Sequence, residues 1–308
     1  MSIEKKDEVY FVFTCGGTQI KIFDHFIQHH LDIGIKKENI YFCYHKNVNI
    51  SNEYHIAWQN TFKNLGLNPT ITIESEFDSK RIQLEPLIKI KSILPKTSWV
   101  VRTDTDCFIE LTGCNNIYDF CNIVENDNAS YSRAVVVDRI TTDGELKDIE
   151  REKNIFEQFP VALKDYGRLR QLYKAYNDIP LDSTPKTIFN RPRESLVFLH
   201  RNFINYSTSV HNIDFPDDPN IKCYSKLGTL HHFKWDKTFL ERHRKDMSIL
   251  GKKYNRSNIT GVYETFRSSN DNYLDIDKIK STFKKQIEPK LMKYSAEFPS
   301  NIGEPKWI

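Results

Sequence analysis

The chain has 308 residues, of which 39% are hydrophobic and 28% charged, so it can bury a large core and is too apolar to be disordered. Its 44 basic and 41 acidic residues leave a formal net charge of +3, and no stretch gathers basic residues as a nucleic-acid-binding surface does. We therefore expect no nucleic-acid partner. A solvated helix face explains the short basic run at residues 242–245 best, and an anionic substrate or a peripheral membrane contact is the alternative.

The six cysteines form no CxxC pair and do not follow the spacing of metal ligands. Several lie in apolar runs, where a reduced thiol packs as a small hydrophobic side chain. The first eight residues carry no apolar signal-peptide core, and no apolar run reaches the roughly 20 residues that span a bilayer. The sequence therefore predicts a cytoplasmic protein without a transmembrane segment.

Strands and helices alternate along the first hundred residues. We expect strands at residues 9–14, 39–44, 69–73 and 98–102, and helices at residues 22–31, 54–65 and 84–94. Gly34 and Gly66 end the first two helices, and Pro86 opens the third. This alternation indicates a parallel sheet with helical crossovers, the usual architecture of nucleotide-binding α/β proteins.

Beyond residue 106 the alternation becomes less regular. We expect strands at residues 131–137, 196–199 and 229–233, and helices at residues 148–158, 166–176 and 237–254. No Pro- or Ser-rich linker and no internal repeat divides the chain. The predicted fold class is α/β, with a helical C-terminal appendage.

The sharpest local feature is the pair Asp104 and Asp106, which follows the apolar strand at residues 98–102 directly. Ligands of open α/β sheets bind beyond the carboxyl ends of the strands. Two carboxylates there suit Mn²⁺ or Mg²⁺, which complete their coordination with phosphate oxygens and water. An Asp-rich turn would give the same sequence. The strand in front of the pair favours the metal site, where the cation would neutralise a leaving diphosphate.

Three further segments accompany this DxD pair: FIQHHLDIG at residues 26–34, VDRITTDG at residues 137–144 and LHHFKW at residues 230–235. In this order the four segments resemble those of GT-A glycosyltransferases of the family-2-like and family-92-like group, over about residues 9–265. The chain departs from that group at two places. Cys107 stands where many members have Glu, and Cys15-Gly16-Gly17-Thr18 replaces an Asn-Glu pair after the first strand.

The resemblance implies the GT-A fold, a Rossmann-like mixed sheet flanked by helices. It places a glycosyltransferase domain at residues 1–235, with a donor half at about 9–110 and an acceptor half at about 111–235, and a packed helical extension at 236–308. It implies a nucleotide-sugar donor, first of all a UDP-sugar, and a glycan or glycolipid acceptor. Asp106 would bind the metal directly, and Asp104 would support the ribose or the metal.

The same resemblance implies the remaining site residues. Those expected to bind the donor nucleotide are Thr14, Cys15, Asp78, Arg81, Asp104, Thr105 and Lys186. GT-A enzymes often complete the metal site with a histidine from the C-terminal half, for which His211 and His231 are the candidates. A histidine in an apolar strand is more often a core residue, so both roles stay open.

Inverting transfer, which the resemblance implies, requires a carboxylate that takes the proton of the acceptor hydroxyl. Asp138 and Asp143 are the candidates, and Asp138 is favoured. Either could instead be a turn residue before Gly144.

Two other functions would use the same DxD pair. A sugar-phosphate nucleotidyltransferase needs a Gly-rich loop with a basic residue after the first strand, and residues 15–18 are too few for it. A non-catalytic carbohydrate-binding protein is the alternative if Cys107 indicates that the site is no longer catalytic. Turnover of a nucleotide sugar would separate the three functions.

Overall fold

The structure is a computed structural model that describes residues 8–76, 80–163, 169, 172, 176, 195–205, 221–240, 257–270 and 272–287. The chain divides into two compact units. The first comprises Met1–Val135 and Ser195–Leu230, and the second Val136–Glu194 and His231–Ile308. The division at residue 235 that the sequence suggests remains a prediction.

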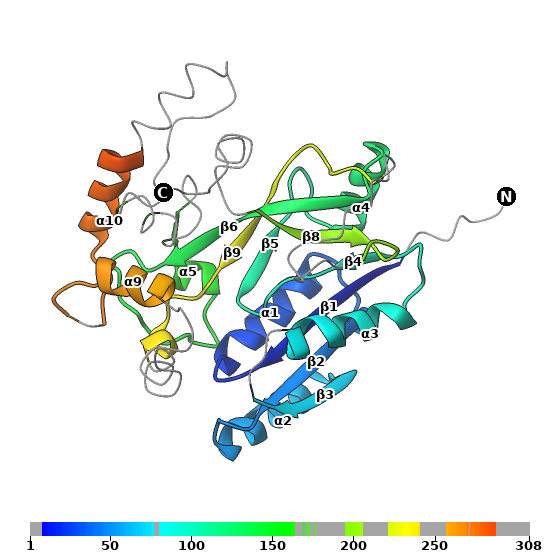
Figure 1. Ribbon diagram of the computed structural model, residues 1–308, viewed down its shortest axis with the longest axis horizontal. Coiled ribbons are helices and arrows are strands. Elements are labelled where there is room, and N and C mark those ends of the chain that lie inside the picture. Colours follow the sequence, from blue (N-terminus) through cyan, green and yellow to red (C-terminus); the bar gives the residue numbers. More distant parts are fainter. Residues whose placement is uncertain are drawn as a thin grey trace. The chain divides into compact units, whose positions relative to one another are not determined.

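The first unit contains the predicted alternation of strands and helices (Figure 1). Its elements are β1 (Val9–Gly16), α1 (Ile20–Asp32), η1 (Lys37–Asn39), β2 (Ile40–Asn47), α2 (Asn52–Leu65), β3 (Ile71–Ser75), η2 (Lys80–Leu84), α3 (Glu85–Ile93) and β4 (Trp99–Val101). Strand β1 pairs in parallel with β2 on one side and with β4 on the other, and β2 pairs in parallel with β3. The predicted parallel sheet is therefore confirmed.

Further strands, some of them antiparallel to their neighbours, complete the sheet. They are β5 (Cys107–Glu110), β6 (Tyr131–Ile140), β8 (Ser195–Arg201) and β9 (Gly228–His232). The order is β3-β2-β1-β4-β8-β6-β9-β5, and the short β7 (Val161–Ala162) pairs with β6, which gives nine strands over the described residues. Other helices are α4 (Ile117–Asn126), α5 (Ile155–Gln158), α9 (Ser257–Phe266), α10 (Ile276–Thr282) and η4 (Phe283–Ile287). The predicted mixed sheet flanked by helices is confirmed.

Alternating side chains of β1 supply the cores on the two faces of the first unit's sheet, because successive residues of a strand point to opposite faces. On one face Phe13 stacks on Phe42 with 5.2 Å between ring centroids, and Phe23 of α1 meets Trp58 of α2 edge-on at 5.0 Å. On the other, Val12 belongs to a cluster with residues of α3 and β4. Helices α1, α2 and α3 thus cover the two faces of the parallel strands. Loops follow the carboxyl ends of these strands.

The second unit has its own apolar core. Its buried members are Ile140, Leu146, Leu163, Leu169, Leu172, Trp235, Phe239, Leu240, Val262, Tyr263, Phe266, Leu274, Ile279 and Phe283. Helices α9 and α10 contribute to this core, and the helical extension expected at residues 236–308 stays a prediction. Among the residues that the structure describes, no helix has both the length and the apolar composition needed to cross a membrane.

The predicted helix at residues 148–158 is wrong over most of its length, since only Ile155–Gln158 is helical. The side chain of Gln158 folds back onto the backbone of Glu150. Its Oε1 accepts from the Glu150 amide at 2.8 Å, and its Nε2 donates to the Glu150 carbonyl at 2.9 Å. It also donates to the carbonyl of Lys153 at 2.8 Å. These bonds satisfy the backbone of the loop in place of a helical ladder. Most of the predicted helices at 166–176 and 237–254 lies outside the described residues.

Candidate functional site

The loops after β1 and β4 leave the same edge of the first unit's sheet. Strand β1 pairs in parallel with β4 through Val9↔Trp99 and Phe11↔Val101, so both strands end at that edge. The chain runs from β1 to β2 on one side and returns later to β4 on the other side. Such a reversal of strand order is where open α/β sheets bind ligands.

The loop after β1 depends on its two glycines. Gly16 has φ 150°, and a Cβ atom there would overlap the carbonyl oxygen of His45 on β2. Gly17 has φ 74°, a conformation that side chains disfavour. The indole Nε1 of Trp58 donates to the carbonyl of Gly17 at 2.8 Å. The loop is therefore held tightly against the end of β2 before it enters α1.

The DxD pair lies in the tight turn between β4 and β5. The amide of Cys107 donates to the carbonyl of Asp104 at 2.9 Å, which closes the turn. The buried guanidinium of Arg102 donates through Nη2 to Asp104 Oδ1 at 2.8 Å. Both aspartates are half-buried. The Arg102 guanidinium therefore fixes the Asp104 carboxylate. Asp106 lies one residue before β5.

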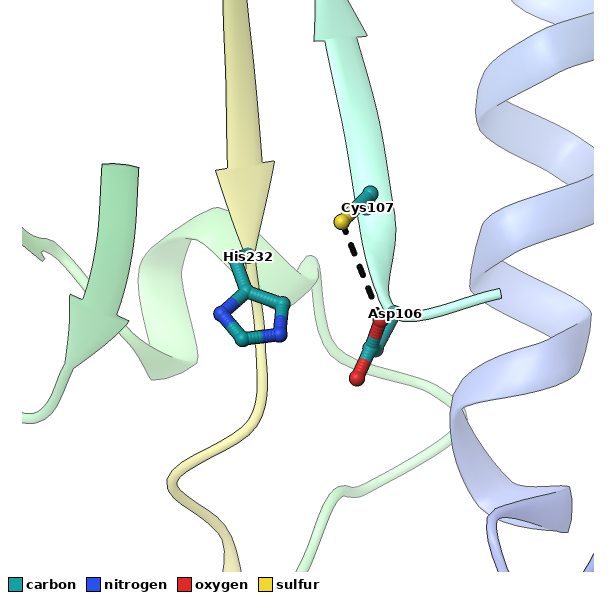
Figure 2. Close-up of side chains that lie close together, drawn as sticks. All are labelled: Asp106, Cys107 and His232. Atoms are coloured by element: carbon teal, nitrogen blue, oxygen red, sulfur yellow. Dashed lines mark hydrogen bonds between the residues drawn. The ribbon is translucent and has the colours of Figure 1, made fainter. Parts of the chain in front are cut away.

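Asp106 has a thiol neighbour in place of the Glu of the resembling group. Cys107 is 1% exposed, and its Sγ donates to Asp106 Oδ1 at 3.7 Å (Figure 2). A buried Glu at this position would set a second negative charge beside Asp106. The Cys107 thiol instead donates to the Asp106 carboxylate.

Three side chains near the two loops carry buried polar atoms without a hydrogen-bond partner within the described part of the chain. They are Thr18 Oγ1, Gln19 Nε2 and Thr103 Oγ1. Thr103 is 2% exposed, and Gln19 occupies the N-cap position of α1 without capping it. A buried polar atom left unpaired costs about 1–3 kcal/mol, so native proteins leave few of them. These three atoms offer hydrogen-bonding groups at this edge.

The structure places four of the predicted nucleotide-binding residues in these loops or at the end of β1. Asp104 and Thr105 lie in the turn after β4, while Thr14 and Cys15 lie in β1. Thr14 Oγ1 donates to the carbonyl of Ile82 at 3.2 Å. Cys15 is 3% exposed, and burial raises the pKa of its thiol well above the usual range. Asp78, Lys186 and the side chain of Arg81 lie outside the described residues.

In the second unit Asp138 is buried and accepts three hydrogen bonds. Its side chain is on β6 and the residue is 2% exposed. Oδ1 accepts from Nδ1 of His232 at 2.6 Å. Oδ2 accepts from Nε1 of Trp235 at 2.8 Å and from the amide of Leu169 at 2.9 Å. Asp138 therefore ties two of the sequence motifs together, VDRITTDG and LHHFKW.

The two neighbouring histidines of β9 have different surroundings. His231 packs edge-on against the ring of Phe156 at 5.2 Å. His232, at the end of β9, pairs with Asp138 (Figure 2 draws its ring). Adjacent residues of a strand point to opposite faces, so only one of the two can share a face with Asp138. The sequence predicts a role for His231 and none for His232, and His211 lies outside the described residues.

Asp143 forms the turn that precedes Gly144. Its exposed carboxylate accepts from the amide of Glu145 at 3.1 Å, and this bond is the main reason that the Asp143 pKa lies below its ordinary value. Gly144 has φ 83°, and a Cβ atom there would overlap the carbonyl oxygen of Leu274. The glycine of the VDRITTDG motif is thus explained by close backbone packing.

The chain matches no family model and no curated protein sequence. Among solved structures it is similar to residues 1–349 of S. aureus TarS, at 10% identity over 95% of this chain and 76% of that chain, with a TM-score of 0.31. A second structure of S. aureus TarS 1–349, in complex with UDP-GlcNAc, gives 11% identity over 93% and 77%, with a TM-score of 0.34.

Proposed function

We propose that the chain is a metal-dependent, inverting glycosyltransferase. It transfers a sugar from a nucleotide-sugar donor, first of all a UDP-sugar, to a hydroxyl group of a glycan or glycolipid. The observation that carries this proposal is the position of Asp104 and Asp106, directly after β4 and beside β1, where the strand order reverses. The four sequence motifs that resemble GT-A enzymes support it.

The donor set at this edge suits Mn²⁺ or Mg²⁺. Carboxylate oxygens are the ligands that these hard cations prefer, and one or two are enough when phosphates supply the others. Asp106 would be the direct ligand, because the Arg102 guanidinium already engages Asp104. The cation, when bound, supplies positive charge that stabilises the departing nucleoside diphosphate.

The loop after β1 would hold the donor. The buried polar atoms of Thr18, Gln19 and Thr103 offer hydrogen-bonding groups for the ribose and the phosphates. The N-terminus of α1, which no side chain caps, adds backbone N–H groups of the kind that bind phosphate. Gly16 and Gly17 let the backbone come close to the ligand.

For the base we now favour Asp143 over Asp138. A base must touch the acceptor hydroxyl, and Asp143 is exposed, whereas three donors occupy the buried carboxylate of Asp138. Its lowered pKa keeps Asp143 ionised at neutral pH, in the form that accepts a proton.

The test is calorimetry with UDP and GDP, each with and without Mn²⁺. We expect Mn²⁺-dependent binding of one nucleotide, which Asp106→Ala abolishes and which Asp119→Ala, a change at an exposed aspartate of α4, leaves intact. Unchanged nucleotide affinity in Asp106→Ala would overturn the assignment of the metal site.

A panel of nucleotide sugars then tests the reaction. Release of the nucleoside diphosphate from one donor supports a glycosyltransferase. Exchange of pyrophosphate instead would indicate a nucleotidyltransferase, and binding without any turnover would indicate a non-catalytic protein.

A further inference from the structure

Helix α3 and the turn after β8 expose large apolar side chains in the first unit. Ile93, the last residue of α3, is 64% exposed, and Ile88 of the same helix is 49% exposed. Phe203, in the turn after β8, is 48% exposed. A single exposed apolar side chain needs no explanation, whereas a group of them at one place indicates a binding surface.

Buried polar side chains fix Phe203 beside the end of α3. Asn202 is 1% exposed, and its Nδ2 donates to three carbonyls at the end of the helix and just after it, those of Lys91, Leu94 and Pro95, at 3.0, 2.9 and 3.1 Å. The buried ammonium group of Lys91 donates to the carbonyl of Ile204. The residues on both sides of Phe203 are therefore bonded to the same helix end, and the turn holds the Phe203 ring at the surface.

The exposed charges beside these side chains are lysines. Lys89 lies between Ile88 and Ile93 in the sequence of α3, and Lys96 follows the helix. Both lysines are exposed. Residues 86–101 and 195–205 contain no acidic residue, and the one acid of α3 is at its first position. We call Ile88, Lys89, Ile93, Lys96 and Phe203 the α3 patch.

Backbone hydrogen bonds bring a third exposed lysine to this end of the sheet. The amide of Arg201 donates to the carbonyl of Ser130 at 2.9 Å, and the amide of Ser130 donates to the carbonyl of Lys222 at 2.8 Å. Glu125 also approaches this strand end, but its carboxylate is paired with Arg201 at 2.5 Å. The surroundings of the α3 patch are therefore basic.

We propose that the α3 patch docks the protein on a membrane surface that contains anionic lipids. Lysines attract anionic headgroups, and apolar side chains such as Ile93 and Phe203 enter the boundary between headgroups and acyl chains. A protein partner fits less well, because protein interfaces are depleted of lysine and enriched in Tyr, Trp and Arg.

Docking through the α3 patch would not cover the proposed donor site. Helix α3 ends before β4 begins, whereas Asp104 and Asp106 follow the carboxyl end of β4. The membrane surface and the donor loops are thus at opposite ends of this strand. The inference goes beyond the proposed function and holds whether or not the chain transfers a sugar.

Flotation of the full chain with lipid vesicles measures docking. We expect binding to vesicles of phosphatidylcholine mixed with phosphatidylglycerol, and weaker binding to phosphatidylcholine alone or at raised salt. Each lysine near an anionic surface adds about fivefold in affinity, so Lys89→Gln with Lys96→Gln should weaken binding about 25-fold. The matched control, Lys37→Gln with Lys63→Gln, removes the same charge from exposed lysines outside the patch and should bind as the wild type does.

The apolar contribution is tested in the same assay. Ile93→Ser with Phe203→Ser should weaken binding about tenfold or more, because both side chains leave water on docking. Val48→Ser with Ile56→Ser is the matched control, since these residues are 50% and 49% exposed and lie outside the patch. Circular dichroism verifies that each variant folds, and the lysine pair keeps the test valid should the serine pair unfold.

Three results would overturn the proposal. The first is a wild type that does not float with the mixed vesicles. The second is an equal loss of binding in patch and control variants, which would assign the attraction to the net charge of the chain. The third is a dimer, detected by sedimentation without lipid, that Ile93→Ser with Phe203→Ser dissociates, because the patch would then bind a second copy of the chain.

Discussion

Buried His200 makes the first unit sensitive to acid. The residue lies on β8 with 0% exposure, and its Nδ1–H donates to the carbonyl of Arg201 at 2.8 Å. Burial disfavours the imidazolium form, and the nearby charge of Lys91 disfavours it further. Together they lower the His200 pKa from 6.5 to about 3.

The sign of the effect follows from where protons bind. Below pH 6.5 the unfolded chain takes up a proton at His200, and the folded chain does so only near pH 3. The free energy of unfolding is therefore unaffected above pH 6.5 and falls as the pH drops from there to about 3. Each pH unit in this window costs about 1.4 kcal/mol, which amounts to at most about 5 kcal/mol.

His200→Leu removes the titrating group and keeps the position apolar. Urea unfolding followed by circular dichroism at pH 7, 6, 5 and 4 gives the free energy of unfolding for both proteins. We expect the wild type to lose up to about 1.4 kcal/mol per pH unit more than the variant below pH 6.5. The difference in unfolding free energy between the two proteins at pH 7 measures any packing cost of the substitution, and it is subtracted from the differences at lower pH. Parallel pH curves for the two proteins would refute this account of His200.

Three further changes probe the loops and a buried lysine. Gly144→Ala should cost about 1–3 kcal/mol of unfolding free energy in urea, because its Cβ atom meets Leu274; Gly113→Ala, at the same φ of 83° with open space around it, should cost less. Asp143→Asn should slow sugar transfer at unchanged UDP and Mn²⁺ affinity, and unchanged transfer would place the base elsewhere. Burial lowers the Lys91 pKa from 10.5 to about 7, so the unfolded chain binds more protons across that range and wild-type stability rises with pH; Lys91→Met should flatten this rise in urea unfolding.

The parallel half of the fold could be predicted because each element there has a local signal. Apolar runs bounded by glycines gave the strands, and the three- and four-residue spacing gave the helices. Helix α4 was missed although the signal exists, since Ile117, Phe120, Cys121 and Val124 share that spacing and the Asn116 side chain caps the helix. Strand β5 is four residues long and follows a turn at once, so it has no pattern of its own.

The contacts of Asp138 could not be predicted in the same way. Its partners His232 and Trp235 are 94 and 97 positions away. Choosing between His231 and His232 requires knowing which face of β9 turns inward, and a shift of one residue reverses every side chain of a strand. The DxD pair could be proposed from the sequence because the argument for it depends only on the strand directly before it.

The buried polar atoms at the edge of β1 and β4 also bear on whether the proposed site still binds a ligand. A protein without a ligand at this edge would gain stability by replacing Thr103 with an apolar residue, because its buried hydroxyl has no partner within the described residues. The same holds for the buried amide of Gln19. Cys107 donates its thiol to Asp106. These two polar groups, of Thr103 and Gln19, would serve the ligand site proposed at this edge.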